Sequence, residues 1–150
     1  MRAVIERLSG EPADRLQALV VESERQGFRF VRRLVDEWRS GANRFDRPGE
    51  VLFAARSGPD VVGVCGLTVD PHAQDPRIGR VRHLYVLVPY RRVGVGEQLV
   101  ADVIGSARGR FTRLHLRTTS AAAARLYERL GFRPAPGPHH SHALVLGDDG

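Results

Sequence analysis

The apolar positions of the first forty residues predict a strand followed by two helices. Residues 2–8 are consistent with a strand, and apolar residues at helical spacing continue from Pro12, a residue suited to opening a helix, as far as Gly27. From Phe28 to Trp38 the apolar residues recur every three or four positions, which is typical of an amphipathic helix. We interpret this apolar stripe as part of the core.

The middle of the chain predicts three strands in succession. Apolar, β-branched runs occupy residues 50–57 and 61–69 and are joined across residues 58–60, as in a short hairpin. A polar loop over residues 70–79 leads to a third run at residues 80–88. Three strands without an intervening helix favour an antiparallel meander.

The last third of the chain returns to mixed elements. A helical pattern starts at Val95 and fades at Gly109, and a second, over residues 121–130, follows Ser120, a good N-cap. The strands predicted here cover residues 111–118, 132–133 and 143–146.

These elements predict a single α+β domain over residues 1–150. Its central sheet is mixed and mostly antiparallel, and helices flank it. The fourth and fifth strands can lie parallel, because a helix crosses between them.

Composition narrows the class of protein. The chain has 150 residues, 42% hydrophobic and 27% charged, which are ordinary values for a globular domain. Its apolar runs are too short to cross a bilayer, and the N-terminus lacks the pattern of a signal peptide. The one cysteine cannot form an internal disulfide. We therefore expect a cytoplasmic protein without membrane contact.

The net charge of +6 is unevenly distributed along the chain. Residues 1–75 hold 11 arginines and 12 acidic residues, whereas residues 76–150 hold 12 arginines and 5 acidic residues. A surface that binds a polyanion could produce this difference, and so could a pocket for one small multiphosphorylated ligand.

The stretch from Leu84 to Gly96 carries the clearest chemical signal. A β-branched run passes through two arginines and reaches Gly94 and Gly96 at the start of a helical pattern. A strand that turns into a helix brings unpaired N–H groups and the positive end of the helix dipole to one point. Glycines remove the Cβ atoms that would keep a phosphate from the backbone. The stretch lacks the P-loop ending and the third glycine of a dinucleotide fingerprint.

Two motifs in this order resemble the GNAT superfamily of N-acetyltransferases. Arg91-x-x-Gly94-x-Gly96, after Leu84-Tyr85-Val86, is similar to the family's acyl-CoA pyrophosphate motif. The second resembles the family's helix ending in Leu-Tyr-Glu-x-x-Gly-Phe, and here it reads Ser120-x-x-Ala123-x-x-Leu126-Tyr127-Glu128-Arg129-Leu130-Gly131-Phe132.

The resemblance implies a fold whose fourth and fifth strands splay apart around the pantetheine of acetyl-CoA. Backbone groups around Val86 and Val88 would pair with pantetheine, the N–H groups from Arg92 to Glu97 would hold the pyrophosphate, and Arg91 or Arg92 would face phosphate. The cofactor-binding residues expected in this way are Val86, Leu87, Val88, Arg91, Arg92, Val93, Gly94, Val95, Gly96, Glu97 and Ser120. Ser120 stands where the family usually has Asn, and Pro89 lies one place later than the common proline.

The reaction implied is direct acetyl transfer from acetyl-CoA to a primary amine of a small molecule or a protein. The resemblance assigns Tyr127 as the acid that protonates the departing sulfur. The alternative is a tyrosine that only packs on the fifth strand. Many members carry a glutamate base early in the fourth strand, whereas this chain has arginines there and then His83. His83 is the nearest titratable substitute, and Asp70, His72 or a water chain remain open.

Other candidate residues favour structural interpretations. Cys65 lies in an apolar strand, which favours core packing over a nucleophile. His139, His140 and His142 lie in a Pro/Gly-rich loop without matching ligands, so we expect no metal.

The acceptor stays open. Acidic residues of the first half could favour a cationic acceptor, although a solvated helix face explains them more simply; they are Glu22, Glu24, Asp36 and Glu37. Two rival functions are a catalytically weak acyl-CoA-binding regulator and a basic nucleic-acid-binding module, and the latter lacks any motif. A homodimer through the C-terminal strands is a further expectation.

Overall fold

Seven strands form one sheet in the computed structural model, which describes residues 3–147. The strands are β1 (Val4–Arg7), β2 (Val51–Ser57), β3 (Asp60–Val69), β4 (Ile78–Val86), β5 (Arg113–Leu116), β6 (Arg133–Pro134) and β7 (His142–Val145). The helices are α1 (Gln17–Arg25), α2 (Phe30–Ser40), the 3-10 turn η1 (Val88–Tyr90), α3 (Val95–Ala107) and α4 (Ala121–Arg129). Within the described range, none of these helices is long and apolar enough to span a membrane.

Each element predicted from the pattern is present, and the largest difference is at the start of the first helix. Residues 13–16 form turns, and α1 begins only at Gln17. The Glu11 carboxylate accepts the Ala13 N–H, and the Leu16 N–H bonds to the Pro12 carbonyl, so the chain turns before it becomes α-helical.

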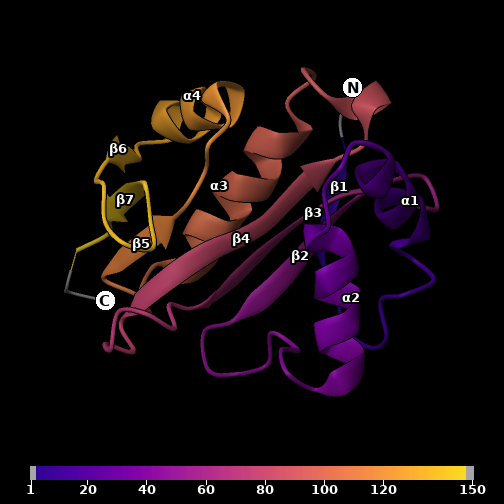
Figure 1. The fold of residues 1–150 in the computed structure, drawn as a ribbon. Coiled ribbons are helices and arrows are strands. Elements are labelled where there is room, and N and C mark those ends of the chain that lie inside the picture. The colour runs from indigo at the N-terminus through magenta and orange to yellow at the C-terminus, as the bar shows by residue number, and fades with distance from the viewer. Residues whose placement is uncertain (1–2, 148–150) are drawn as a thin grey trace.

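The first four strands form the predicted antiparallel meander, and helices cover both of its faces. The sheet order is β1-β2-β3-β4-β5-β7-β6. Figure 1 shows α1 and α2 together on one side of the sheet, with α3 and α4 away from them. One apolar cluster packs α3 against the sheet through Leu99, Val103 and Leu114, and a second packs α1 and α2 on the other face through Leu19, Leu34 and Leu52. The mixed, mostly antiparallel fold predicted from the sequence is confirmed.

The fourth and fifth strands are parallel but stay together only over a short distance. The register pairs Ile78 with Arg113, Gly79 with Leu114 and Arg80 with His115, and no later pair follows. β4 continues to Val86, whereas β5 ends at Leu116. The β5-side edge of β4 therefore has no strand partner beyond Arg80 among the described residues.

A bulge interrupts β4 beside this open edge. Val64 pairs with Tyr85 and Gly66 with Arg82, so His83 and Leu84 together stand opposite Cys65 alone. His83 takes a left-handed conformation with φ 63°. A bulge bends its strand and increases the local twist, which turns the end of β4 away from β5.

Candidate active site

The turn after β4 presents a free helix N-terminus at the open edge. Gly94, with φ 90°, is the N-cap of α3, and Arg92 before it has φ 64°. The first helical hydrogen bond runs from the Gln98 N–H to the Gly94 carbonyl (3.0 Å). The N–H groups of Val95 and Gly96 therefore have no acceptor inside the helix, and they point out of its positive end. This geometry suits an anion such as pyrophosphate.

The two glycines of this turn have different structural roles. Gly94 needs its left-handed φ, and a Cβ there would meet no heavy atom within 4 Å. A Cβ at Gly96 would lie 3.1 Å from Leu126 Cδ1, because α4 packs closely on the first turn of α3. The sequence interpretation, that both glycines clear the backbone for phosphate, therefore misses the contact at Gly96.

At the end of β4, the backbone groups are already hydrogen-bonded to other residues of the protein. The Leu87 N–H is donated to Val62 O in β3 (2.9 Å), so it points away from the open edge. Val86 O accepts Arg91 Nε (2.7 Å), and the Val88 N–H donates to Glu22 Oε1 (3.0 Å). The assignment of Leu87 as a cofactor contact stays a prediction. Its N–H is not available to a cofactor, because it is bonded to Val62 O.

A polar network ties this end of β4 to α1. The Tyr85 hydroxyl donates to Glu22 Oε1 (2.6 Å), and burial together with the Glu22 charge raises the pKa of Tyr85. Arg91 lies over the Tyr85 ring and donates from Nη2 to Gln26 Oε1 (3.1 Å). The Arg91 guanidinium thus faces α1. Arg92 is exposed and has no ion pair among the described residues, so it is the better placed of the two for phosphate.

Helix α4 supplies the other wall of the candidate site. Ser120 Oγ caps it by accepting the Ala123 N–H (3.2 Å), as predicted. The Glu97 carboxylate, in the first turn of α3, forms an ion pair with Arg129 Nη2 (2.6 Å). This pair fixes α4 beside the N-terminus of α3, although its exposure makes its own energy small.

Tyr127 is buried on the face of α4 that packs toward the sheet. It is 7% exposed, and its ring meets Phe132 edge-on at 5.7 Å between centroids. Burial, followed by the neighbouring Cys65, raises the pKa of Tyr127, so its hydroxyl stays protonated at neutral pH. Such a hydroxyl can donate a proton but is not itself a base. Cys65 is fully buried, and burial raises its thiol pKa to about 12, which agrees with core packing.

His83 is surrounded by aromatic side chains on the face of the sheet that α1 and α2 cover. Its ring stacks on Phe30 and meets Phe45 edge-on, at 6.4 Å and 6.1 Å between centroids. Burial, then the charges of nearby arginines, lower the pKa of His83 to about 3. At neutral pH the ring is uncharged, and it is a weak base. Its role as the base stays a prediction, and the Nε2 atom is buried without a hydrogen-bond partner.

The remaining histidines are held by separate partners. His115 donates from Nδ1 to Asp70 Oδ2 (2.7 Å) while its Nε2 accepts Arg113 Nε (2.9 Å). Burial alone would raise the Asp70 pKa, but hydrogen bonds from the His72 N–H and from His115 outweigh it and hold that pKa below its usual range. Both carboxylate oxygens of Asp70 therefore already accept hydrogen bonds, from the His72 N–H and from His115.

The loop histidines stack in pairs. His139 stacks on His72 (3.8 Å between centroids) and His140 on His115 (4.0 Å), while His142 binds Glu128 (2.9 Å). Across residues 3–147, no three His, Cys, Asp or Glu side chains come together as metal ligands.

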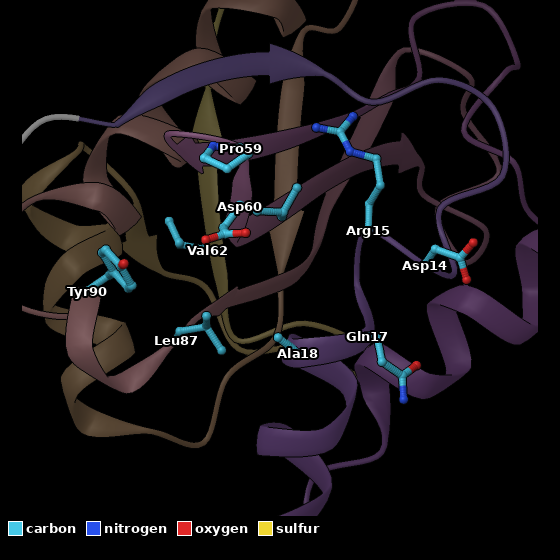
Figure 2. A pocket seen from close by; sticks show the side chains of 10 residues that line it. Asp14, Arg15, Gln17, Ala18, Pro59, Asp60, Val62, Leu87 and Tyr90 are labelled. Carbon is cyan, nitrogen blue, oxygen red and sulfur yellow. The ribbon is translucent and has the colours of Figure 1, made fainter.

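A surface hollow of about 680 Å³ lies on the α1 side of this region (Figure 2). In Figure 2 the start of α1, with Gln17 and Ala18, faces the β2–β3 turn at Pro59, and Tyr90 closes the far side. Leu87 is the one predicted cofactor residue that lines it. The hollow adjoins the end of β4 and is wide and open to solvent.

The model of the acetyltransferase (GNAT) family matches residues 15–132. The chain belongs to this family. A crystal structure of an Exiguobacterium sp. 255-15 protein described as an acetyltransferase is 29% identical, with a TM-score of 0.86 over 97% of this chain and 94% of that one. A GNAT-family acetyltransferase of Streptococcus pneumoniae is 19% identical, with a TM-score of 0.73 over 97% and 100% of the two chains.

N-acetylglutamate synthase of Neisseria gonorrhoeae, solved with coenzyme A and N-acetyl-glutamate, has the same fold. It is 19% identical, with a TM-score of 0.72 over 99% of this chain and 36% of that one. Family membership makes this GNAT protein an acyltransferase that takes its acyl group from an acyl-CoA.

The two GNAT motifs lie next to each other in the structure. The sequence analysis did not predict the polar network of Glu22, Tyr85 and Val88 behind them. The turn at Gly94 and helix α4 with Tyr127 pack together around Leu126. Glu22 was interpreted as part of a solvated helix face, yet its carboxylate holds the Val88 N–H from 66 residues away. No local pattern in α1 distinguishes this acid from its neighbours.

Proposed function

We propose that this GNAT protein transfers the acetyl group of acetyl-CoA to a primary amine by direct attack in a ternary complex. The observation that carries the proposal is the unpaired edge of β4 after Arg80, which is followed, after the short turn η1, by the free N-terminus of α3. The edge offers peptide groups to an amide-bearing chain, and the helix end offers N–H donors to phosphate. Pantetheine and pyrophosphate occur in this order in coenzyme A.

The described residues support each step of the transfer. A neutral amine attacks the thioester carbonyl, a backbone N–H of the open edge near Val86 stabilises the oxyanion, and the C–S bond then breaks. The Tyr127 hydroxyl, protonated at neutral pH, is the acid that gives its proton to the thiolate. The proton released by the amine returns to Tyr127 through water. The new amide and the free thiol are the products.

Displacement of two internal contacts accompanies binding in this proposal. Val86 O and the Val88 N–H are held by Arg91 and Glu22 in the structure, so pantetheine would exchange with these side chains. The exchange replaces one hydrogen bond by another at each backbone group and therefore costs little.

Thiol release from acetyl-CoA across a panel of amines tests the proposal. We expect thiol and acetylated amine in equal amounts, with no thiol released in the absence of an acceptor beyond slow hydrolysis. Tight CoA binding without transfer to any amine would instead support the weak acyl-CoA-binding regulator. That second candidate draws on one observation, that β4 carries arginines where many relatives carry a base.

A further inference from the structure

Three arginines converge on the sheet face that α1 and α2 cover only in part. Val81 packs into the α3 cluster, so the pleat turns Arg80 and Arg82 to the opposite face. Arg80 is in register with His115 of β5, which points to the same face. Arg117 follows the last residue of β5, and its charge acts on Arg80. In Figure 1 the start of β4 and β5 lies at the left of the sheet, laterally displaced from α1 and α2 at the right.

Among the described residues, these guanidinium groups form no ion pair with a carboxylate. The acidic charge that acts on Arg80 is that of Asp70, whose Oδ2 is already hydrogen-bonded to His115 Nδ1 (2.7 Å). Within residues 3–147, Arg80, Arg82 and Arg117 form no ion pair and no hydrogen bond, whereas surface arginines such as Arg15, Arg32 and Arg129 are paired. Partial burial, then the charge of Arg82, lowers the pKa of Arg80; the Asp70 charge acts against this, and the charge of Arg117 adds to the lowering. Unpaired like charges at a half-buried position are unfavourable in the free protein.

Two neighbouring polar atoms on the same face also have no partner. Thr68 stands opposite Arg80 in the β3–β4 register and is 4% exposed. Its Oγ1 and the Nε2 of His83 are buried atoms without a hydrogen-bond partner. Buried polar groups in native proteins are usually satisfied, so the Thr68 hydroxyl is an unused donor beside Arg80. The Nε2 atom of the neutral His83 ring donates or accepts according to its tautomer.

The position of the arginines relates them to the reaction. β4 and β5 separate immediately after Arg80 and His115, so the arginines lie at the narrow end of the gap. The wide end is occupied, in the proposed function, by the thioester. An acceptor whose amine reaches the thioester from the α1 and α2 face can therefore extend along β4 toward this charged end.

We propose that the acceptor is an amine that also carries an anionic group, a carboxylate or a phosphate, and that Arg80, Arg82 and Arg117 bind this group. The inference rests on the proposed function and names its substrate class. Arginine binds both oxyanions in two-pronged geometry, and the Thr68 hydroxyl adds a donor. The same positive field lowers the pKa of a bound ammonium, which supplies the neutral amine without a carboxylate base.

The cationic acceptor that acidic residues of the first half could favour loses part of its support in the same structure. Of the acidic residues that suggested it, Glu22 is bound to Tyr85 and Val88, and Glu24 is paired with Arg32 at 2.9 Å. Neither carboxylate is free to receive a second ammonium group of a substrate.

A matched acceptor series tests the inference. kcat/KM is measured with 4-aminobutyrate, 3-aminopropylphosphonate, butylamine and 1,4-diaminobutane. Longer and shorter homologues of each compound are measured as well. We expect an anionic amine to exceed the neutral one by about tenfold or more, since charge-assisted hydrogen bonds to a bound anion are strong. The carboxylate and phosphonate arms identify which anion is preferred.

The variants Arg80→Gln and Arg82→Gln should remove most of this preference, and Arg82→Glu should shift it toward the diamine. Arg108→Gln, an exposed arginine at the far end of α3, is the charge-matched control and should retain the preference. Because Arg80 and Arg82 are unpaired, their variants should melt no lower than the parent, which separates a binding defect from misfolding.

The outcomes distinguish the two proposals. Equal or better acetylation of butylamine or the diamine, or a preference that survives both glutamine variants, overturns the anionic acceptor while acetyl transfer stands. If no amine is acetylated, the proposed function fails. Calorimetric titration with the anionic amines in the presence of CoA then decides the arginine site alone: binding that Arg82→Gln abolishes supports it, and no binding overturns it.

Discussion

Replacing Tyr127 by phenylalanine removes one hydroxyl and leaves the ring in place. The ring packs edge-on against Phe132, and no hydrogen bond to the hydroxyl is formed by any described residue. We therefore expect the free energy of unfolding to change by less than about 1 kcal/mol, because no buried partner is left unsatisfied.

The effect on the reaction should be much larger than the effect on stability. General acid catalysis by a positioned side chain contributes roughly a hundredfold to ten-thousandfold, which corresponds to about 3–5 kcal/mol of transition-state free energy. Because burial raises the pKa of Tyr127, the wild-type rate should also show no alkaline loss from this residue up to the ordinary tyrosine range.

The assay follows thiol release from acetyl-CoA under saturating acceptor, together with CoA affinity by calorimetry. Tyr90→Phe is the matched control, since Tyr90 lines the nearby hollow and takes no part in the proposed chemistry. A fall in kcat for Tyr127→Phe alone, with unchanged CoA affinity and melting, supports the acid. Full turnover by Tyr127→Phe would mean that the thiolate leaves without help from this hydroxyl.

Three further predictions follow from backbone conformation, titration and the network behind β4. Gly94→Ala should destabilise the protein by about 1–2 kcal/mol in urea unfolding, because φ is 90° there. Gly105→Ala, at an exposed position in the last turn of α3, should stabilise it by about 0.5–1 kcal/mol; equal effects would contradict the conformational reasoning. The pKa of His83 is lowered to about 3 in the folded protein, whereas an unfolded histidine is protonated below about pH 6.5. The free energy of unfolding should therefore decline as the pH falls from about 6.5 toward 3, and the decline should be less steep in His83→Gln. If His83 is the base, the acidic limb of kcat/KM should also lie near pH 3 and disappear in the variant. Glu22→Ala leaves the Tyr85 hydroxyl and the Val88 N–H without their acceptor and should cost about 1–3 kcal/mol. Glu24→Ala, whose ion pair is exposed, is the control and should change stability far less; a cost no larger than the control's would mean that the network is not stabilising.

The sequence by itself determined the elements and their order. Apolar periodicity distinguishes helices from strands locally, so the meander, the helix after Gly94 and the Ser120 cap could all be predicted from neighbouring residues. The order of strands and helices then allows few topologies, and the parallel pairing of β4 and β5 follows from the helix between them. The family motifs are local as well, because each surrounds one turn or one helix end.

Only the tertiary structure decided how far β4 and β5 stay paired and what lies beside the gap. The bulge at His83 depends on the register of β4 against β3, which is set by packing across the sheet and leaves no mark in the pattern. The contact of Glu22 with Val88 joins residues distant in the chain, and nothing in α1 indicates it. The shared face of Arg80 and His115 likewise depends on two strands meeting in one register, and it brings Arg117, just after β5, near Arg80. Contacts of this kind arise from long-range packing, whereas local periodicity records only which side of its own element a residue occupies.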